Sequence, residues 1–110
     1  MKKTKLGEFE ELVLLTVIVL QENAYGVEIK KELEKRLEEV LSVGSIQSSL
    51  KRLEEKGFLT SAFGEATQRR GGKRKRIYSA TQHAVRVLSE LKNLRYDLWQ
   101  SAPSTTLNFG

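Results

Sequence analysis

Nine consecutive residues near the N-terminus, LVLLTVIVL from Leu12 to Leu20, contain no charge. A membrane-spanning helix needs about 20 apolar residues, so this run has about half of the required length. Three lysines precede it, as in a signal peptide, but three glutamates intervene and no convincing small-residue cleavage site follows. We therefore predict that Glu8–Gln21 forms a buried helix of a cytoplasmic protein, although its Val and Ile content would also suit a strand.

The size of the chain limits what can cover this helix. Its 110 residues have room for one domain. Because a chain this short can bury only a limited core, association with a second copy would help to stabilise it. A hydrophobic content of 39% and a charged content of 30% are typical of a folded chain. The sequence has no cysteine, which excludes disulfides and Cys-based zinc sites and weakly favours a reducing compartment.

Two amphipathic segments follow the apolar run. Tyr25–Leu37 places Ile29, Leu33 and Leu37 at i, i+4 and i+8, which predicts a helix with one apolar face. The next predicted helix has sharper ends, because Ser42 is a suitable N-cap and Gly57 a suitable residue just after the C-terminus.

The helix that starts at Ser42 has two different faces. Its apolar face consists of Val43, Ile46, Leu50 and Leu53, and its other face of Gly44, Ser45, Ser48, Lys51, Arg52 and Glu55. Small, hydroxyl and cationic side chains suit a helix in a DNA major groove, although an ordinary solvated surface would have a similar pattern. The candidate DNA-contacting residues of this helix are Ser45, Gln47, Ser48, Lys51 and Arg52.

The segment RRGGKRKR, Arg69–Arg76, concentrates positive charge. It carries six cations against a net charge of +5 for the whole chain, so the other residues sum to −1. Two β-prone runs, Phe58–Phe63 and Arg76–Ala80, flank it and predict a hairpin with a basic tip. Such a tip can contact phosphates or a minor groove, although a localisation tag or a solvated loop would also be basic. The candidates are Arg69, Arg70, Lys73, Arg74, Lys75 and Arg76.

The last predicted helix, Gln82 to about Gln100, begins at a Thr81 cap and has a long apolar stripe. One small domain cannot cover all of this stripe, so we predict that part of it pairs with another chain. The candidate dimerisation residues are Leu88, Leu91, Leu94 and Leu98. Trp99 lies beside the stripe and could stack against a planar aromatic ligand, although packing under a partner helix is the simpler role.

The predicted fold class is mainly α with a small β-hairpin: a winged helix-turn-helix with a C-terminal dimerisation helix. The expected domains are 1–80 for DNA binding, 81–100 for dimerisation and 101–110 as a flexible tail after the helix.

Four segments in this order closely resemble the PadR-like transcriptional repressors. They are LGEFEELVLLTVIVL, AYGVEIKKELE, LSVGSIQSSLKRLEEKGFL and GGKRKRIY, within about Leu6 to Leu88. The resemblance implies that Tyr25–Leu37 is the first helix of the turn motif, Ser42–Lys56 the recognition helix and Gly71–Ile77 the wing. It also implies the smaller PadR subfamily, a homodimer made by the C-terminal helix, a palindromic operator and, by analogy with some members, an aromatic ligand between subunits.

The chain departs from the family pattern in two places. Gln47 stands where the family usually has a tyrosine, which leaves the operator sequence open. Thr81-Gln82-His83-Ala84 stands where the family tends to have T-P-x-G, so the entry angle of the last helix is open.

Other function classes fit the sequence less well. The chain has one histidine, His83, expected on the surface, and it has no nucleophile–base order, paired carboxylates, HExxH or P-loop, so we expect neither an enzyme, a metal site nor a cofactor. RNA binding would call for exposed aromatic residues in the wing, and the basic segment has none. A pure dimerisation module with an incidental basic loop remains as a further alternative.

Overall fold

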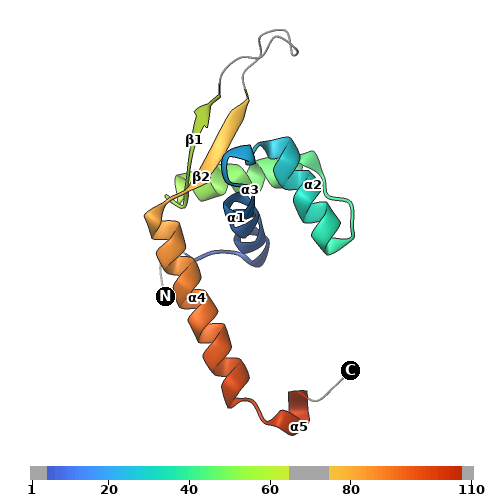
Figure 1. Ribbon diagram of the computed structural model, residues 1–110, viewed down its shortest axis with the longest axis vertical. Coiled ribbons are helices and arrows are strands. Elements are labelled where there is room, and N and C mark those ends of the chain that lie inside the picture. Colours follow the sequence, from blue (N-terminus) through green and yellow to red (C-terminus); the bar gives the residue numbers. More distant parts are fainter. Residues whose placement is uncertain (1–4, 65–74, 108–110) are drawn as a thin grey trace.

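A computed structural model describes residues 5–64 and 75–107 of the chain (Figure 1). Its elements in order are α1 (Glu8–Leu20), the 3-10 turn η1 (Gln21–Asn23), α2 (Gly26–Leu37), α3 (Val43–Glu55), β1 (Leu59–Phe63), β2 (Arg76–Ala80), α4 (Gln82–Ser101) and α5 (Ser104–Leu107). The expected fold class, mainly α with a hairpin, is confirmed. Within the described ranges, none of the helices is long and apolar enough to cross a membrane.

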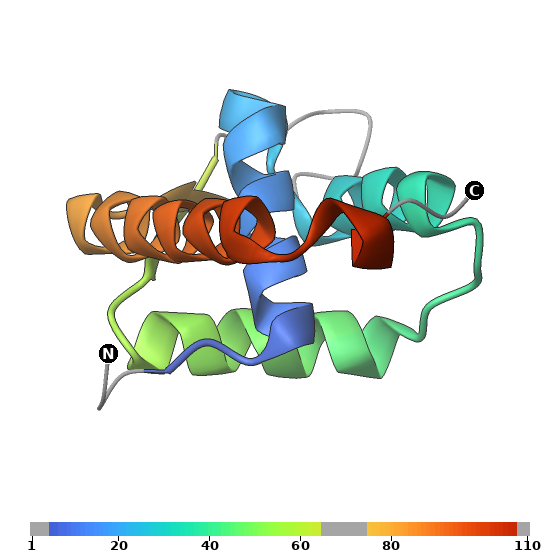
Figure 2. The same cartoon turned by 90° about the horizontal axis from the view of Figure 1, so that it is seen from below.

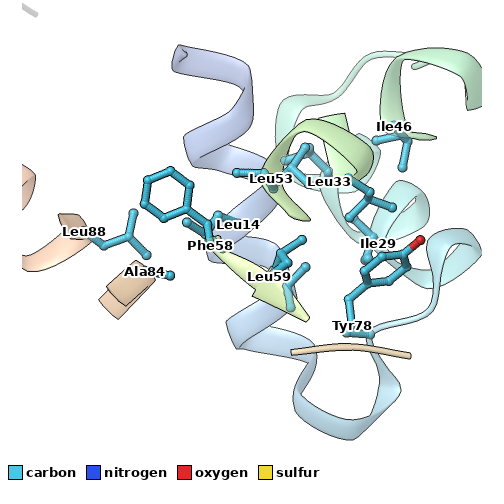
Figure 3. Packing of buried hydrophobic residues seen from close by; sticks show 14 residues of the cluster. Leu14, Ile29, Leu33, Ile46, Leu53, Phe58, Leu59, Tyr78, Ala84 and Leu88 are labelled. Carbon is cyan, nitrogen blue, oxygen red and sulfur yellow. The ribbon is translucent and has the colours of Figure 1, made fainter. Parts of the chain in front are cut away.

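The core forms around α1, which packs against α2, α3 and β2. The buried hydrophobic side chains of α1 are Val13, Leu14 and Val17, and they join hydrophobic residues of the neighbouring helices and of the hairpin in a single cluster. Ala84 and Leu88, from the first turns of α4, lie in the same cluster beside Phe58 (Figure 3). The start of α4 is therefore part of the body formed by the other helices and the hairpin, and only its later turns extend away from that body (Figure 1).

The hairpin is antiparallel and is attached to the body at its base. Leu59 pairs with Ala80 and Phe63 with Arg76. The N–H of Tyr78 donates to the carbonyl oxygen of Ala24 at 3.0 Å, which joins β2 to the segment between α1 and α2. The tip between the strands, which includes Arg69, Arg70, Lys73 and Arg74, lies outside the described residues.

The helix ends predicted from the sequence are confirmed by their geometry. The hydroxyl of Ser42 accepts a hydrogen bond from the N–H of Ser45 at 3.0 Å, and the hydroxyl of Thr81 accepts one from Ala84 at 3.1 Å. Gly57 has φ of +82°, a left-handed conformation that a glycine adopts without strain. These caps fix where α3 and α4 begin and where α3 ends.

The burial of two apolar residues differs from what the spacing along their helices suggests. Val43 was placed on the buried face of α3, but it is exposed, because it is the first residue of the helix and lies beyond the core cluster. Leu88, predicted to take part in dimerisation, is already buried in the core cluster of its own chain, and its part in dimerisation stays a prediction. The regular apolar spacing continues along each helix, but the core that buries these residues covers only part of the helix.

The prediction for α1 also needs correction. The helix was expected to be buried on most sides, but Leu15, Ile18 and Val19 are exposed. His83, expected at the surface, is half-buried, and its ring stacks on Phe58 with 4.8 Å between centroids. The tail was expected to be loose, but α5 adds a turn of helix after Pro103.

Candidate nucleic-acid interface

The helix α3 lies at one edge of the molecule (Figure 2). Gln47, Ser48 and Lys51 are exposed there, as the sequence predicts. The inner face is buried against the core through Ile46, Leu50 and Leu53. An anchored inner face and an accessible polar outer face are what a helix needs to enter a major groove without rearrangement.

Ser45 and Arg52, also predicted to contact DNA, have partners within the protein. The hydroxyl of Ser45 donates to the carbonyl oxygen of Ser42 at 2.9 Å and so belongs to the helix start. Arg52 donates from Nε to the carboxylate of Glu10 at 2.8 Å and from Nη2 to the hydroxyl of Ser49 at 3.3 Å. The geometry therefore assigns Arg52 to holding α3 on α1, a role that the sequence analysis missed.

Glu10 is the centre of this connection between α1 and α3. Its buried carboxylate accepts hydrogen bonds from Arg52, from Nζ of Lys56 at 2.8 Å and from the N–H of Gly7 at 2.9 Å. Burial alone would raise the pKa of Glu10, but the hydrogen bonds from Lys56, Gly7 and Arg52 outweigh it and lower the pKa to about 2. The charged network therefore fixes the C-terminal half of α3 relative to α1.

The turn between α2 and α3 is fixed in a similar way. Glu38 ends α2 in the left-handed conformation, with φ of +57°. The carboxylate of Glu34 accepts a hydrogen bond from the N–H of Leu41 at 2.8 Å and pairs with Lys30 at 3.0 Å. The hydrogen bonds from Leu41 and Lys30 lower the pKa of Glu34. The start of α3 is thus held in one orientation against α2.

The base of the wing carries the two described cations of the basic segment. Nζ of Lys75 lies over the ring of Tyr25, 4.8 Å from its centroid. The guanidinium of Arg76 lies 4.7 Å from the centroid of the Phe63 ring and donates to the hydroxyl of Ser61 at 2.9 Å. Both cations therefore stabilise the end of the hairpin next to its tip, and the ring of Tyr25 joins this end to the start of α2.

Gln47 lies where α3 meets the start of α2. A Cβ atom added to Gly26 would come within 2.9 Å of Nε2 of Gln47, which is closer than real Cβ contacts. The glycine therefore leaves room for the amide of Gln47. Gln47 stands at this junction of α2 and α3 in place of the tyrosine that the family pattern has.

A second surface, the α1–α4 groove, lies between those two helices. It has a volume of about 370 Å³ and is lined by the apolar side chains of Leu15, Ile18, Val85 and Leu88. Arg95 stands at its edge and donates to the carboxylate of Glu11 at 2.9 Å. The groove continues the apolar surface of α1 that this chain leaves exposed.

The remaining predicted site residues lie further along α4. Leu91 is half-buried, whereas Leu94 and Leu98 are 51% and 62% exposed. Trp99 is exposed as well and forms a shallow hollow with Arg95, Leu98 and Ala102. These residues belong to the part of α4 that extends away from the body (Figure 1).

A family model, described as the transcriptional regulator PadR-like family, matches residues 14–93. The chain belongs to the PadR-like family. Members of this family are transcriptional regulators and not enzymes, so the expected function class, regulation of transcription through DNA binding, is confirmed. No curated protein matches the chain.

Solved structures of PadR-like regulators share the fold. The chain is similar to a PadR family transcriptional regulator from Eggerthella lenta, with 26% identity, a TM-score of 0.67 and coverage of 94% of this chain and 88% of the other. It is also similar to a PadR-like regulator from Bacillus cereus, with 22% identity, a TM-score of 0.69 and coverage of 93% of both chains. A PadR-like transcription factor from Bacteroides fragilis has 24% identity, a TM-score of 0.69 and coverage of 84% of both chains. The winged helix-turn-helix is thereby confirmed.

Proposed function

We propose that this protein is a cytoplasmic repressor that binds a palindromic operator in duplex DNA as a homodimer. The observation that carries the proposal is the outer face of α3, where Gln47, Ser48 and Lys51 are exposed on a helix whose inner face is buried. Gln47 and Lys51 reach base edges, and the hydroxyl of Ser48 reaches either a base or a phosphate. The six cations of RRGGKRKR contact mainly phosphates, with one arginine in a minor groove.

RNA binding is a weaker candidate on the same surface. Recognition of single-stranded RNA depends on aromatic rings that stack on bases. Near the described base of the wing, the rings of Tyr25 and Phe63 are each already in contact with a cation. A competition titration with duplex DNA and single-stranded RNA of equal length separates the two functions, because a DNA-specific repressor is displaced by duplex alone. A protein that only dimerises would show no salt-dependent affinity for either.

The homodimer is supported by the apolar surface that one chain leaves uncovered. The stripe on α4 begins in the core at Ala84 and Leu88 and continues through Leu94 and Leu98, where it is exposed. The α1–α4 groove lies alongside it and has the same apolar character. A second copy would cover both surfaces by laying its own α4 against them, which would place two α3 helices on one DNA duplex.

The first prediction concerns the wing. Replacing Lys73 and Arg74 by glutamine should weaken binding to operator DNA and to random DNA by similar factors. It should also reduce the slope of log K against log salt by roughly 0.9 per lost phosphate contact. Fluorescence anisotropy at several salt concentrations measures this slope. The control variant, Lys31→Gln with Lys35→Gln, removes the same charge from α2 and should change the slope less. An unchanged slope in the wing variant would rule out its phosphate contacts.

The second prediction concerns release of the operator by a planar aromatic ligand that stacks on Trp99. In the proposed dimer, the shallow hollow formed by Arg95, Leu98, Trp99 and Ala102 lies near the contact between the two α4 helices. A ligand bound there would change the separation of the two α3 helices. Isothermal calorimetry with a panel of planar aromatic cations should give saturable binding that Trp99→Ala abolishes. Tyr96→Ala, at another exposed aromatic residue of α4, should retain it. No saturable binding across the panel would leave Trp99 as a packing residue.

A further inference from the structure

Val43 is an exposed apolar residue at the start of the helix that we propose to read DNA. It is the first residue of α3 and is 62% exposed, although the apolar spacing of the sequence continues from it to the buried Ile46 and Leu50. Burial in the chain's own core therefore does not account for a β-branched hydrophobic residue at this position. In helix-turn-helix proteins, the first residues of the recognition helix are those that contact base edges.

The neighbours of Val43 on the helix surface are groups that recognise bases. Gln47 follows at i+4 and Lys51 at i+8. Since residues four apart lie side by side, the three form one exposed ridge that runs from Val43, at the edge of the buried face, to Lys51 on the outer face. Gly44 lies beside this ridge, and a Cβ atom added to it would meet no described atom within 4 Å. The backbone at the start of α3 can therefore approach a base pair closely.

The position of Val43 is also rigid. Ser42 caps the helix at its first turn, and the preceding residue, Leu41, is held by the carboxylate of Glu34 at 2.8 Å. A valine side chain has a strongly restricted χ1 angle, so little conformational entropy is lost when it is placed against a ligand. A conformationally restricted apolar side chain beside the amide of Gln47 forms a small recognition surface.

This surface is complementary to an A·T base pair. In the major groove, glutamine pairs with the N6 and N7 atoms of adenine, and an apolar side chain contacts the 5-methyl group of thymine. The Cβ atoms of residues four apart are about 5–6 Å from each other, a distance that reaches one base pair and its neighbour. We propose that Val43 is a specificity-determining residue that contacts the 5-methyl group of one thymine per half-site, next to the adenine that Gln47 recognises. The proposal rests on the proposed function.

Replacing thymine by deoxyuridine tests this directly, because it removes only the methyl group. Duplexes that carry the selected operator are made with deoxyuridine at one thymine position at a time, in both half-sites, and their affinities are measured by anisotropy. At one position, deoxyuridine should weaken binding by the wild-type protein about 4-fold when it replaces thymine in one half-site, as expected for the loss of one buried methyl group. Replacement in both half-sites of the palindrome should weaken binding roughly 15-fold. Val43→Ala should weaken binding to the thymine operator and should show no further loss with deoxyuridine at that position.

Two variants control for general effects. Val27→Ala removes the same groups from a valine of α2 that is 61% exposed, and it should retain the wild-type sensitivity to deoxyuridine. Val43→Thr keeps one methyl group of the side chain and should retain part of the sensitivity to deoxyuridine. The inference is overturned if no thymine position is sensitive to replacement by deoxyuridine. It is also overturned if Val43→Ala keeps the full sensitivity, which is the result expected if Val43 contacts another protein and not DNA. Failure of the proposed function is recognised separately, because no operator would then be selected.

Discussion

Replacing Leu94 and Leu98 by glutamate is expected to convert the protein to a monomer and to weaken operator binding more than 100-fold. Both residues are exposed in the single chain, so the glutamates disturb no core packing of their own chain. In the proposed dimer, however, they would bury charges between two α4 helices, which is unfavourable by several kcal/mol. Each monomer would then bind one half-site alone and lose the gain in affinity that two linked sites provide.

Sedimentation and DNA binding together measure this effect. The wild-type protein should sediment at twice the chain mass of 12.5 kDa at micromolar concentration, and the variant at that mass. The control, Asn93→Glu with Gln100→Glu, adds the same charge to the other side of α4 and should remain a dimer. A dimeric Leu94→Glu, Leu98→Glu variant, or a wild-type monomer, would contradict the assignment of this surface.

Glu10→Gln is expected to lower the free energy of unfolding by about 1–3 kcal/mol at pH 7. The upper value follows from a folded pKa of about 2 against 4.5 in the unfolded chain. The lower value applies because the side chain of Arg52 is half exposed and solvent screens part of its attraction. Urea unfolding of the wild type and the variant measures the difference, with Glu22→Gln on the exposed turn η1 as the control that should change little.

The dependence on pH follows from the same shift. Because the folded pKa of Glu10 lies below the unfolded value, its contribution is fully present above pH 4.5 and is lost as the pH falls from 4.5 toward 2. The wild type should therefore lose its advantage over Glu10→Gln within this range. If the difference between the two proteins stays constant from pH 6 to pH 2.5, the carboxylate does not stabilise the fold through its charge.

Local signals in the sequence were enough to predict the four long helices and the hairpin, although not the short helix α5. Ser42, Gly57 and Thr81 were recognised as helix ends because each satisfies or permits backbone geometry within a few residues of itself. The hairpin was recognised because two β-prone runs flank a segment that contains glycines. Such features depend on short-range chemistry, so one sequence is sufficient to find them.

Contacts between distant residues could not be predicted in the same way. Arg52 has the same appearance in the sequence whether it faces DNA or Glu10, which lies 42 residues away. Leu88 and Leu94 share one stripe, yet only the first is covered by its own chain. Val43 continues an apolar pattern beyond the core that would bury it. The helix α1 is apolar on two sides, and one of these sides is exposed because only the other faces that core.

Selection of bound duplexes from a random DNA pool tests the central claim most directly. A homodimer that presents two α3 helices should enrich one sequence with twofold symmetry, with half-sites centred about one helical turn, roughly 10 base pairs, apart. Each half-site should contain the adenine that Gln47 recognises and, next to it, the thymine whose methyl group Val43 contacts. A pool that enriches no sequence, or that enriches a single asymmetric site, would contradict the account of this protein as a dimeric, sequence-specific DNA-binding repressor.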